Sequence, residues 1–348
     1  MYTHLLVPLD DTELSMGNVT AAVQLARALD AKLSFCHVMP DATAVRGADG
    51  SLRREGGPAP SSARANVLLA KAAAYARAQQ VECATFSVSG ERTPEAIVQA
   101  AADKGCDLIV MASHAVTGLR TLARRSVTSK VLRESRLPVL ITCVQANDPQ
   151  AQAHRACALI HDEHRSLAAI VHGMEDLLTQ ARDPLGLGFD REGFESMLHY
   201  VVDFPQRLHH PKEEQCLHRL LRARDLQAYL LIDTLETQHR QEHERVSNLQ
   251  TAFTRRAAQA RGDEAALLAL GTALAAFAAH VWEHMETEEQ QLLPMAVEAL
   301  SEKDWAEVAK VFEGNRDPGY GGWSDEAFRR HFMNLANRMA APQGAQDT

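Results

Sequence analysis

The chain has 348 residues, a length that suggests about two domains. It contains 36 Lys and Arg against 45 Asp and Glu, so the formal net charge is −9 at pH 7. This acidic balance excludes a general nucleic-acid binder, which would need a basic face. The sequence shows no signal-peptide pattern and no apolar run of membrane-spanning length, so we expect a cytoplasmic protein without a membrane segment.

Histidine is unevenly distributed along the chain. Of the 16 histidines, three lie in residues 1–150 and twelve lie between His154 and His284. The second half is therefore where metal or proton chemistry is expected. The six cysteines form no CxxC pair, which is typical of reduced thiols in the cytosol.

Short apolar runs alternate with amphipathic segments through residues 1–143. Strands are predicted at 4–9, 32–39, 81–88, 107–112 and 138–142, and helices at about 15–30, 62–80, 94–104 and 120–134. This alternation predicts an α/β domain, a doubly wound parallel sheet with helices on both faces.

The strand signals stop at the polar segment 144–156, which is predicted to be a linker. Helical periodicity then covers about 157–180, 191–222, 225–258 and 264–299, followed by a short piece near 304–313. Residues 157–312 are therefore predicted to form an all-α four-helix up-down bundle. Residues 313–348 are expected to be an extension with a short helix near 324–338 and a polar tail.

Each predicted helix of the bundle carries a segment rich in histidine and glutamate. Two helices have a histidine followed four residues later by a glutamate, which places both side chains on one helix face. The other two helices contribute one histidine each, and this set suits a two-metal site in a bundle core. Imidazoles and carboxylates without thiolates favour iron or manganese over structural zinc. The candidate ligands are His164, His209, Glu213, His239, His284 and Glu288.

Several neighbouring residues remain open as alternatives. His210 with Glu214 is a competing register on the second helix, and His161 and His280 share helices with better candidates. Pro205 and Pro211 should kink the second helix at the site, because proline lacks a backbone amide donor. The remaining histidines of the second half without a partner pattern, expected at the surface or in the core, are His154, His172, His199, His218 and His331.

The segments LLVPLDDTELS, TPEAI, DLIVMASHAVTGL and ARRSVTSKVLRESRLPVLI resemble the universal stress protein family over residues 1–143. The resemblance implies a parallel α/β fold that binds ATP or AMP at the carboxyl ends of its strands. Asp10, Ser126 and Val127 match family positions near the nucleotide, and Val38 ends a neighbouring strand on the same side.

The chain departs from this family in the last loop, where nucleotide-binding members carry G-x2-G-x9-G-(S/T). The three glycine positions are occupied here by Ala112, Ala115 and Arg125. A Cβ atom at the first two positions narrows the cradle that glycine offers to phosphates. The alternative function of this domain is dimerisation through the exposed edge of the strand at 138–142.

The segments HDEHRSLAAIVHGM, FPQRLHHPKEEQCLHRLL, LETQHRQEH and HVWEHMETEEQQLLP resemble the hemerythrin-like (HHE cation-binding) family over about residues 157–300. That family binds a non-haem di-iron centre, commonly oxo-bridged. The resemblance implies the same six ligands, with Glu213 and Glu288 as bridges between two iron ions. Oxygen-carrying members use five histidines, and His243, one turn from His239, is the candidate for the fifth.

These features lead to three hypotheses of function. The first is a stress-related di-iron protein that senses or buffers dioxygen, nitric oxide, peroxide or iron, with the N-terminal domain serving homodimerisation or signal output. The second is a di-iron redox enzyme, or a donor of iron for repair of damaged iron–sulfur centres. The third is a nucleotide-responsive protein whose bundle is only structural.

Overall fold

The computed structural model describes residues 2–10, 13–39, 60–90, 92–115, 126–145, 150–182, 188–258 and 263–313. The chain divides into two compact units, one within residues 1–148 and the other within residues 149–331. The expected helix near 324–338 and the first part of the expected helix at 120–134 lie outside the described residues.

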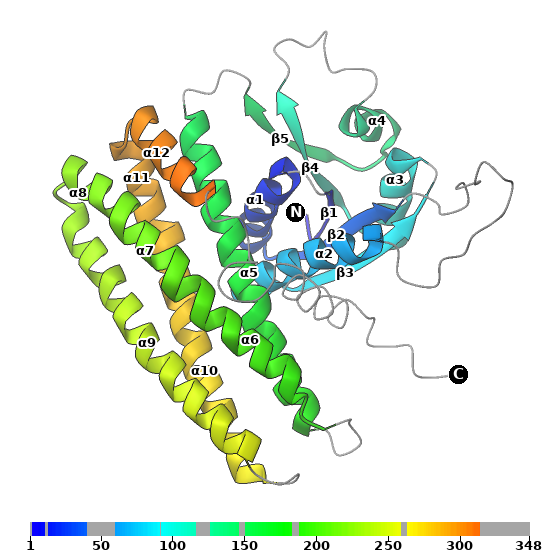
Figure 1. Ribbon diagram of the computed structural model, residues 1–348. Helices are drawn as coiled ribbons and strands as arrows, with labels where there is room; N and C mark the ends of the chain where they lie inside the picture. The colour runs from blue at the N-terminus through cyan, green and yellow to red at the C-terminus, as the bar shows by residue number, and fades with distance from the viewer. Residues whose placement is uncertain are drawn as a thin grey trace, which may run out of the picture. The chain divides into compact units, whose positions relative to one another are not determined.

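The first unit is built on a five-stranded parallel sheet with the strand order β3-β2-β1-β4-β5 (Figure 1). The predicted doubly wound α/β fold is therefore confirmed, since the strand order reverses its direction at β1. Its elements are β1 (His4–Leu9), α1 (Glu13–Leu29), β2 (Lys32–Met39), α2 (Pro60–Ala78), β3 (Cys83–Ser89), α3 (Thr93–Asp103), β4 (Leu108–Ala115), α4 (Val127–Glu134) and β5 (Val139–Gln145).

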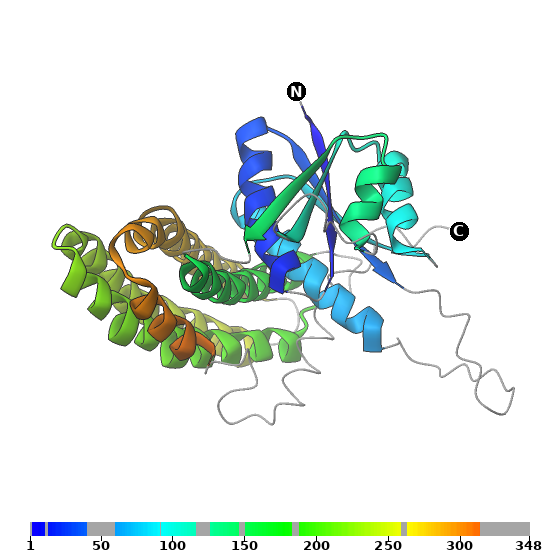
Figure 2. The same ribbon diagram turned by 90° about the horizontal axis from the view of Figure 1, so that it is seen from above.

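Alternate side chains of the central strand β1 face opposite sides of the sheet, which explains why both faces are covered. Leu5 and Val7 belong to a core shared with α1 and α2, whereas Leu6 belongs to a second core shared with α3 and α4. Successive residues of a strand point to opposite faces, so a continuous apolar run indicates a strand buried on both sides. Figure 2 shows the two helix pairs on either side of the sheet.

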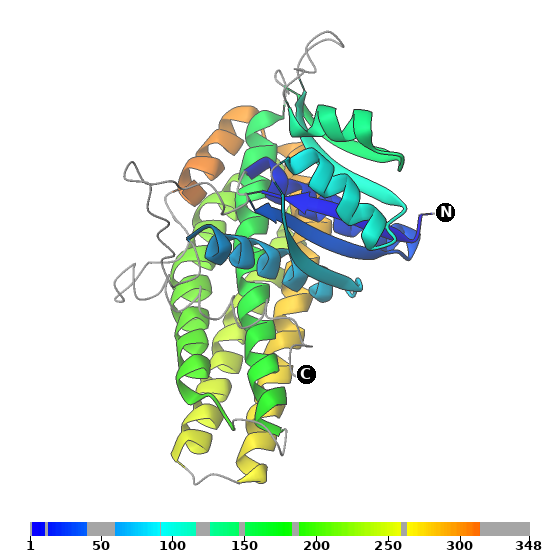
Figure 3. The ribbon, with the colours of Figure 1, turned by 90° about the vertical axis from the view of Figure 1, so that its right-hand side faces the viewer.

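The second unit is a bundle of four long helical stretches, which Figure 3 shows along its length. The first stretch contacts the second and the fourth, and the third also contacts both of these. Its elements are α5 (Ala151–Arg182); α6 (Arg191–Phe204), η2 (Pro205–His209), α7 (His210–Lys212), η3 (Glu213–His218) and α8 (Arg219–Arg224); α9 (Ala228–Ala258); α10 (Glu264–Thr287), η4 (Glu288–Leu292) and α11 (Leu293–Ala299); and a fifth, short helix, α12 (Glu302–Glu313).

The bundle differs from the sequence prediction in two local respects. Helix α5 begins at Ala151, inside the segment predicted as a linker, because Ala153 and Ala156 are buried in the core at that end of the bundle. Three turns, labelled η2, η3 and η4, are π-helical rather than α-helical. The expected kink at the prolines thus takes the form of widened turns within a continuous helical stretch.

One helical stretch of the bundle is long and apolar enough to cross a membrane by length and composition alone. It spans Glu264–Ala299, so the expectation that no such segment exists is not met. The indication is weak, because the core helix of a bundle passes the same test. Residues such as Leu270, Leu274 and Phe277 of this stretch are buried in the protein.

A buried amide fastens helix α1 to the sheet and generates a test of the first unit. Asn18 is buried, donates through Nδ2 to the carbonyl of Val110 at 3.3 Å, and accepts from the Thr142 hydroxyl at 2.8 Å. We expect Asn18→Ala to lower the free energy of unfolding by about 1–2 kcal/mol. Denaturant unfolding followed by circular dichroism measures the change. The control is Gln99→Ala, which removes an exposed bond to Asp103, and equal stability of the two variants would contradict the prediction.

Candidate metal centre

The six predicted ligand residues meet in the interior of the bundle. Each is no more than 3% exposed. One comes from the first helical stretch, two each come from the second and fourth, and one comes from the third, so all four stretches of the bundle contribute. The residues and their elements are His164 (α5), His209 (η2), Glu213 (η3), His239 (α9), His284 (α10) and Glu288 (η4).

The π turns lie at the points where the second and fourth stretches supply these residues. At the end of η2 the amide of His210 donates to the carbonyl of Pro205, five residues earlier, and at the end of η4 that of Leu293 donates to Glu288. Proline follows each of these turns, as Pro211 and Pro294, and cannot donate the usual helical bond. Wide turns of this kind are frequent at functional sites because they change which side chains face inward.

The inward-facing side chains form two groups in which one atom of each residue lies within 4.8 Å of the others. The two groups share Glu213, whose Oε1 is 2.9 Å from Nε2 of His209 and whose Oε2 is 3.4 Å from Nε2 of His239. The first group is His164, His209, Glu213 and Glu288, and the second is His210, Glu213, His239 and His284.

Glu288 also spans the two groups. Its Oε2 atom is 3.2 Å from Nε2 of His164 and 3.8 Å from Nε2 of His284. Two carboxylates therefore lie between the two sets of imidazoles, which is the arrangement needed to bridge a pair of metal ions in a bundle core.

The atoms that face the centre approach one another, as in the 2.9 Å contact of His209 with Glu213, but none makes a well-aligned hydrogen bond among the described residues. They are Nε2 of His164, His209, His239 and His284, Nδ1 of His210, and both carboxylate oxygens of Glu213 and Glu288. Buried polar groups in native proteins are normally paired, so a set of unpaired nitrogen and oxygen atoms needs a further partner. A pair of cations bound by nitrogen and oxygen fits this donor set.

The opposite ring nitrogen of four histidines is held by a side chain of a neighbouring helix. Nδ1 of His164 donates to Glu289 at 2.8 Å and Nδ1 of His209 donates to Glu163 at 2.5 Å. Such partners fix the tautomer and the orientation of a ligand ring and raise its basicity. The other two bonds join His239 to Glu214 at 2.8 Å and His284 to Gln238 at 3.2 Å.

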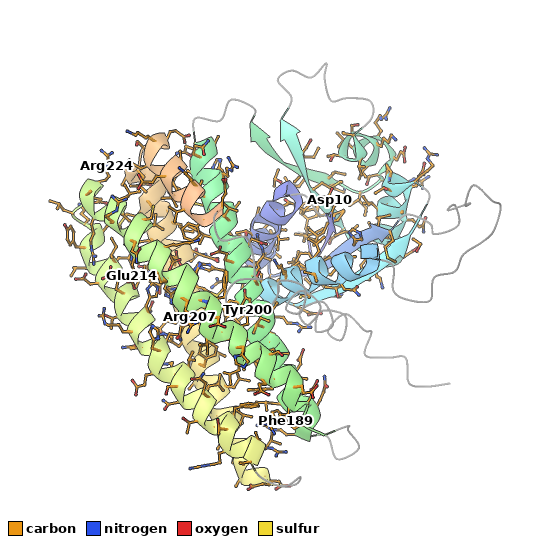
Figure 4. All side chains as sticks on the ribbon, viewed as in Figure 1. Asp10, Phe189, Tyr200, Arg207, Glu214 and Arg224 are labelled. Carbon is orange, nitrogen blue, oxygen red and sulfur yellow. The ribbon has the colours of Figure 1, made fainter. Side chains whose placement is uncertain are left out.

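The sequence analysis missed these outer partners, although each stands next to an inner ligand in the chain. Glu163 precedes His164, Glu214 follows Glu213, and Glu289 follows Glu288. A polar residue beside each candidate was the available signal, but its partner lies on another helix and is not fixed by spacing within one helix. In Figure 4, Glu214 is labelled where its helix runs beside α9, which carries His239.

The charges of the centre are strongly coupled. Burial would lower the pKa of His164, but the adjacent Glu288 and Glu289 outweigh burial and raise it to about 9. Burial would likewise lower the pKa of His239, which its two glutamate neighbours raise to about 9. Burial raises the pKa of Glu288 to about 7 with help from Glu213. In the metal-free protein these imidazoles therefore hold protons near neutral pH that a bound cation would displace.

The neighbouring histidines separate into three kinds. His210, the open alternative on the second helix, lies inside the second group, whereas His243 is exposed and lies in neither group. His280 is buried and bonds to the carbonyl of Gln238 at 2.8 Å, so it has a structural partner. His172 bonds to Glu175 at 2.8 Å on its own helix.

The candidate nucleotide residues of the first unit lie at the carboxyl ends of the strands. Asp10, labelled in Figure 4, follows β1, and Val38 is the penultimate residue of β2. Ser126 caps helix α4 by accepting from the amide of Ser129 at 3.1 Å, and Val127 begins that helix. Ala112 and Ala115 belong to β4, and Arg125 lies outside the described residues.

Comparison with known proteins divides the chain in the same way. A family model described as the universal stress protein family matches residues 1–142, and one described as the hemerythrin HHE cation binding domain matches residues 156–296. The universal stress protein YxiE of Bacillus subtilis is 31% identical over 156 residues, which cover 40% of this chain and 99% of that protein.

Further similar proteins are also universal stress proteins. A universal stress protein of Methanocaldococcus jannaschii is 45% identical over 47 residues, covering 14% of this chain and 29% of that protein. The crystal structure of a universal stress protein in complex with cAMP is 26% identical, with a TM-score of 0.31, and covers 41% of this chain and 97% of that chain.

The outer carboxylates give a matched test of the centre. We expect Glu163→Gln to weaken metal binding roughly 10–100-fold, because His209 loses the carboxylate that orients its ring. The control is Glu175→Gln, which changes a similar histidine–glutamate pair outside both groups. Metal affinity measured by competition with a chelator compares the two variants, and equal losses would show that the outer contact has no specific role.

The raised pKa values of His164 and His239 predict how the metal-free protein responds to pH. Both rings keep their protons up to about pH 9 when folded but only to about 6.5 when unfolded. Their contribution to stability is complete below pH 6.5 and is lost as the pH rises to about 9. We therefore expect the melting temperature of metal-free protein to fall over this interval.

Metal-loaded protein should behave differently in the same measurement, because bound metal replaces these protons. It should lose stability in acid, where protons displace the metal, rather than above neutral pH. Calorimetric melting curves of the two forms across the pH range provide the comparison, and curves that coincide at every pH would contradict the prediction.

Proposed function

Because this chain belongs to the universal stress protein family and joins that domain to a hemerythrin HHE cation-binding domain, we propose that it is a cytoplasmic stress protein with a di-iron centre. The second unit binds two non-haem iron ions and senses or buffers dioxygen, nitric oxide, peroxide or iron. The observation that carries this proposal is the convergence of unpaired nitrogen and oxygen atoms from four helices on two positions that share Glu213.

The candidate ligands belong to two metal positions. His164 and His209 belong to the first position, and His239 and His284 to the second. Glu213 and Glu288 are the proposed bridges, because each faces histidines of both groups. Bound iron would supply redox chemistry and open positions for a small ligand such as dioxygen, nitric oxide or peroxide.

Buried apolar side chains accompany the candidate ligands. Leu217 and Leu292 stand one turn beyond Glu213 and Glu288, and both are completely buried. The ring of His209 also lies 5.9 Å from that of Phe312, edge to face. A surrounding with few polar groups strengthens the electrostatic interactions in the site and admits only small ligands to it.

The first unit is proposed to dimerise the protein or to transmit its signal. Strand β5 is at the edge of the sheet, and Leu140 on that strand is 42% exposed. An unpaired strand edge offers backbone groups to a second copy. ATP or AMP binding near Asp10, Val38, Ser126 and Val127 is a weaker proposal, since alanines replace two glycines of the family pattern.

An enzymatic function is the second candidate, because two bridged metal positions also suit redox turnover or the donation of iron to damaged iron–sulfur centres. Turnover separates the two functions. Catalytic consumption of peroxide or nitric oxide that is abolished by Glu288→Ala would favour an enzyme, whereas binding without turnover would favour a sensor or buffer.

Iron content tests the proposed function. We expect protein from iron-sufficient cells, or after reconstitution with ferrous iron, to contain about two iron ions per chain and to absorb in the near ultraviolet and visible. Glu213→Ala should reduce the iron to less than one ion, because both groups lose the shared carboxylate. His172→Ala is the control, since His172 lies on the first helical stretch, bonds to Glu175 and belongs to neither group. Less than one iron per chain in the reconstituted wild-type protein would refute the proposal.

A further inference from the structure

We propose that His210 is the fifth histidine of the centre, a ligand of the second metal position, and that His243 has no part in it. This inference rests on the proposed function, because it concerns the composition of the same site. Three observations support it: the position of the His210 ring among the candidate ligands, the π turn that precedes His210, and the carboxylate of Glu242 near its Nε2 atom.

The ring of His210 lies among the ligands of the second group. It is 3% exposed, and it stacks on the ring of His239 with centroids 3.9 Å apart and planes inclined by 9°. The ring of His284 meets it edge-on at 5.4 Å. Its Nδ1 atom is buried and has no hydrogen-bond partner in the part of the chain that the structure describes. His210 therefore presents an unused nitrogen where two other ligand rings converge.

The π turn explains how two consecutive histidines serve one centre. In a regular α-helix neighbouring residues point in very different directions, so His209 and His210 would not both face inward. The turn Pro205–His209 closes with a bond from the amide of His210 to the carbonyl of Pro205, which widens the helix at this point. With that turn in place, His209 joins the first group and His210 joins the second.

A buried carboxylate stands behind the His210 ring, as carboxylates stand behind three of the other histidines. Oε2 of Glu242 is 3.8 Å from Nε2 of His210, and Glu242 is 1% exposed. The unpaired Nδ1 of His210 is thus the atom available to a metal, whereas Nε2 faces the outer carboxylate of Glu242. His209 uses its nitrogens the other way round, with Nδ1 on Glu163 and Nε2 toward the centre.

The consequence is that the two positions are chemically unequal. Glu213 and Glu288 face both groups, so the difference lies in the imidazoles, of which the first group offers two and the second offers three. Removal of His210 should therefore weaken the second position and leave every side chain of the first in place. The exposed His243, which the helix spacing had suggested, should be dispensable.

The test uses the full-length protein reconstituted with ferrous iron alone. The variants are His210→Ala and His210→Gln, the second of which fills most of the space of the ring, and His243→Ala is the matched control. Iron per chain is measured together with the absorption spectrum, and circular dichroism reports whether each variant is folded. We expect both His210 variants to lose about half of the iron and to change spectrum, while His243→Ala matches the wild type.

Folded His210→Gln protein that keeps the full iron content and the wild-type spectrum would overturn the inference. So would a loss of iron in His243→Ala equal to that in the His210 variants. A wild-type protein that binds no iron would instead refute the proposed function itself. The two failures are therefore distinguished by whether the wild type loads.

Discussion

Burial of unpaired nitrogen and oxygen atoms is the constraint on which the second unit depends. Each buried polar group left without a partner costs about 1–3 kcal/mol, and here such atoms from four helices face one another. Such atoms also occur elsewhere among the described residues, at His172 and Trp305 for example, but here they belong to two groups of candidate ligands, and the leucines and phenylalanine nearby are ordinary core residues. A bound cation would pair these atoms and link the four helices, so metal binding is expected to stabilise the fold.

The two units were predictable from the sequence to different depths. The sheet follows from a repeated alternation of strand and helix, and apolar runs such as residues 4–9 mark strands that must be buried on both faces. Their ends shifted by a few residues, because the sequence does not show where a ladder of backbone bonds stops. Helix α5 began earlier than expected for a similar reason, since the small residues Ala153 and Ala156 carry little periodic signal yet are buried.

The metal centre was predictable as far as regular helix geometry applies. Spacing of four residues indicates that His284 and Glu288 share a helix face, as do His209 and Glu213, and the structure places all four side chains in the interior of the bundle. The choice between His209 and His210 could not be made in this way, because the helix between Pro205 and His218 is not a regular α-helix. The outer partners depend on contacts between helices, such as Glu163 with His209, and no spacing within one helix specifies them.

The outer partners also form a closed circuit around the bundle. Glu163 of the first stretch holds a ring of the second, and Glu214 of the second holds a ring of the third. Gln238 of the third holds a ring of the fourth, and Glu289 of the fourth returns to the first. Each residue that holds a ring is also the chain neighbour of a candidate ligand on its own helix, so a shift of one helix would move side chains that belong to two helices. Four side-chain hydrogen bonds thus join the four helices in a ring around the candidate centre.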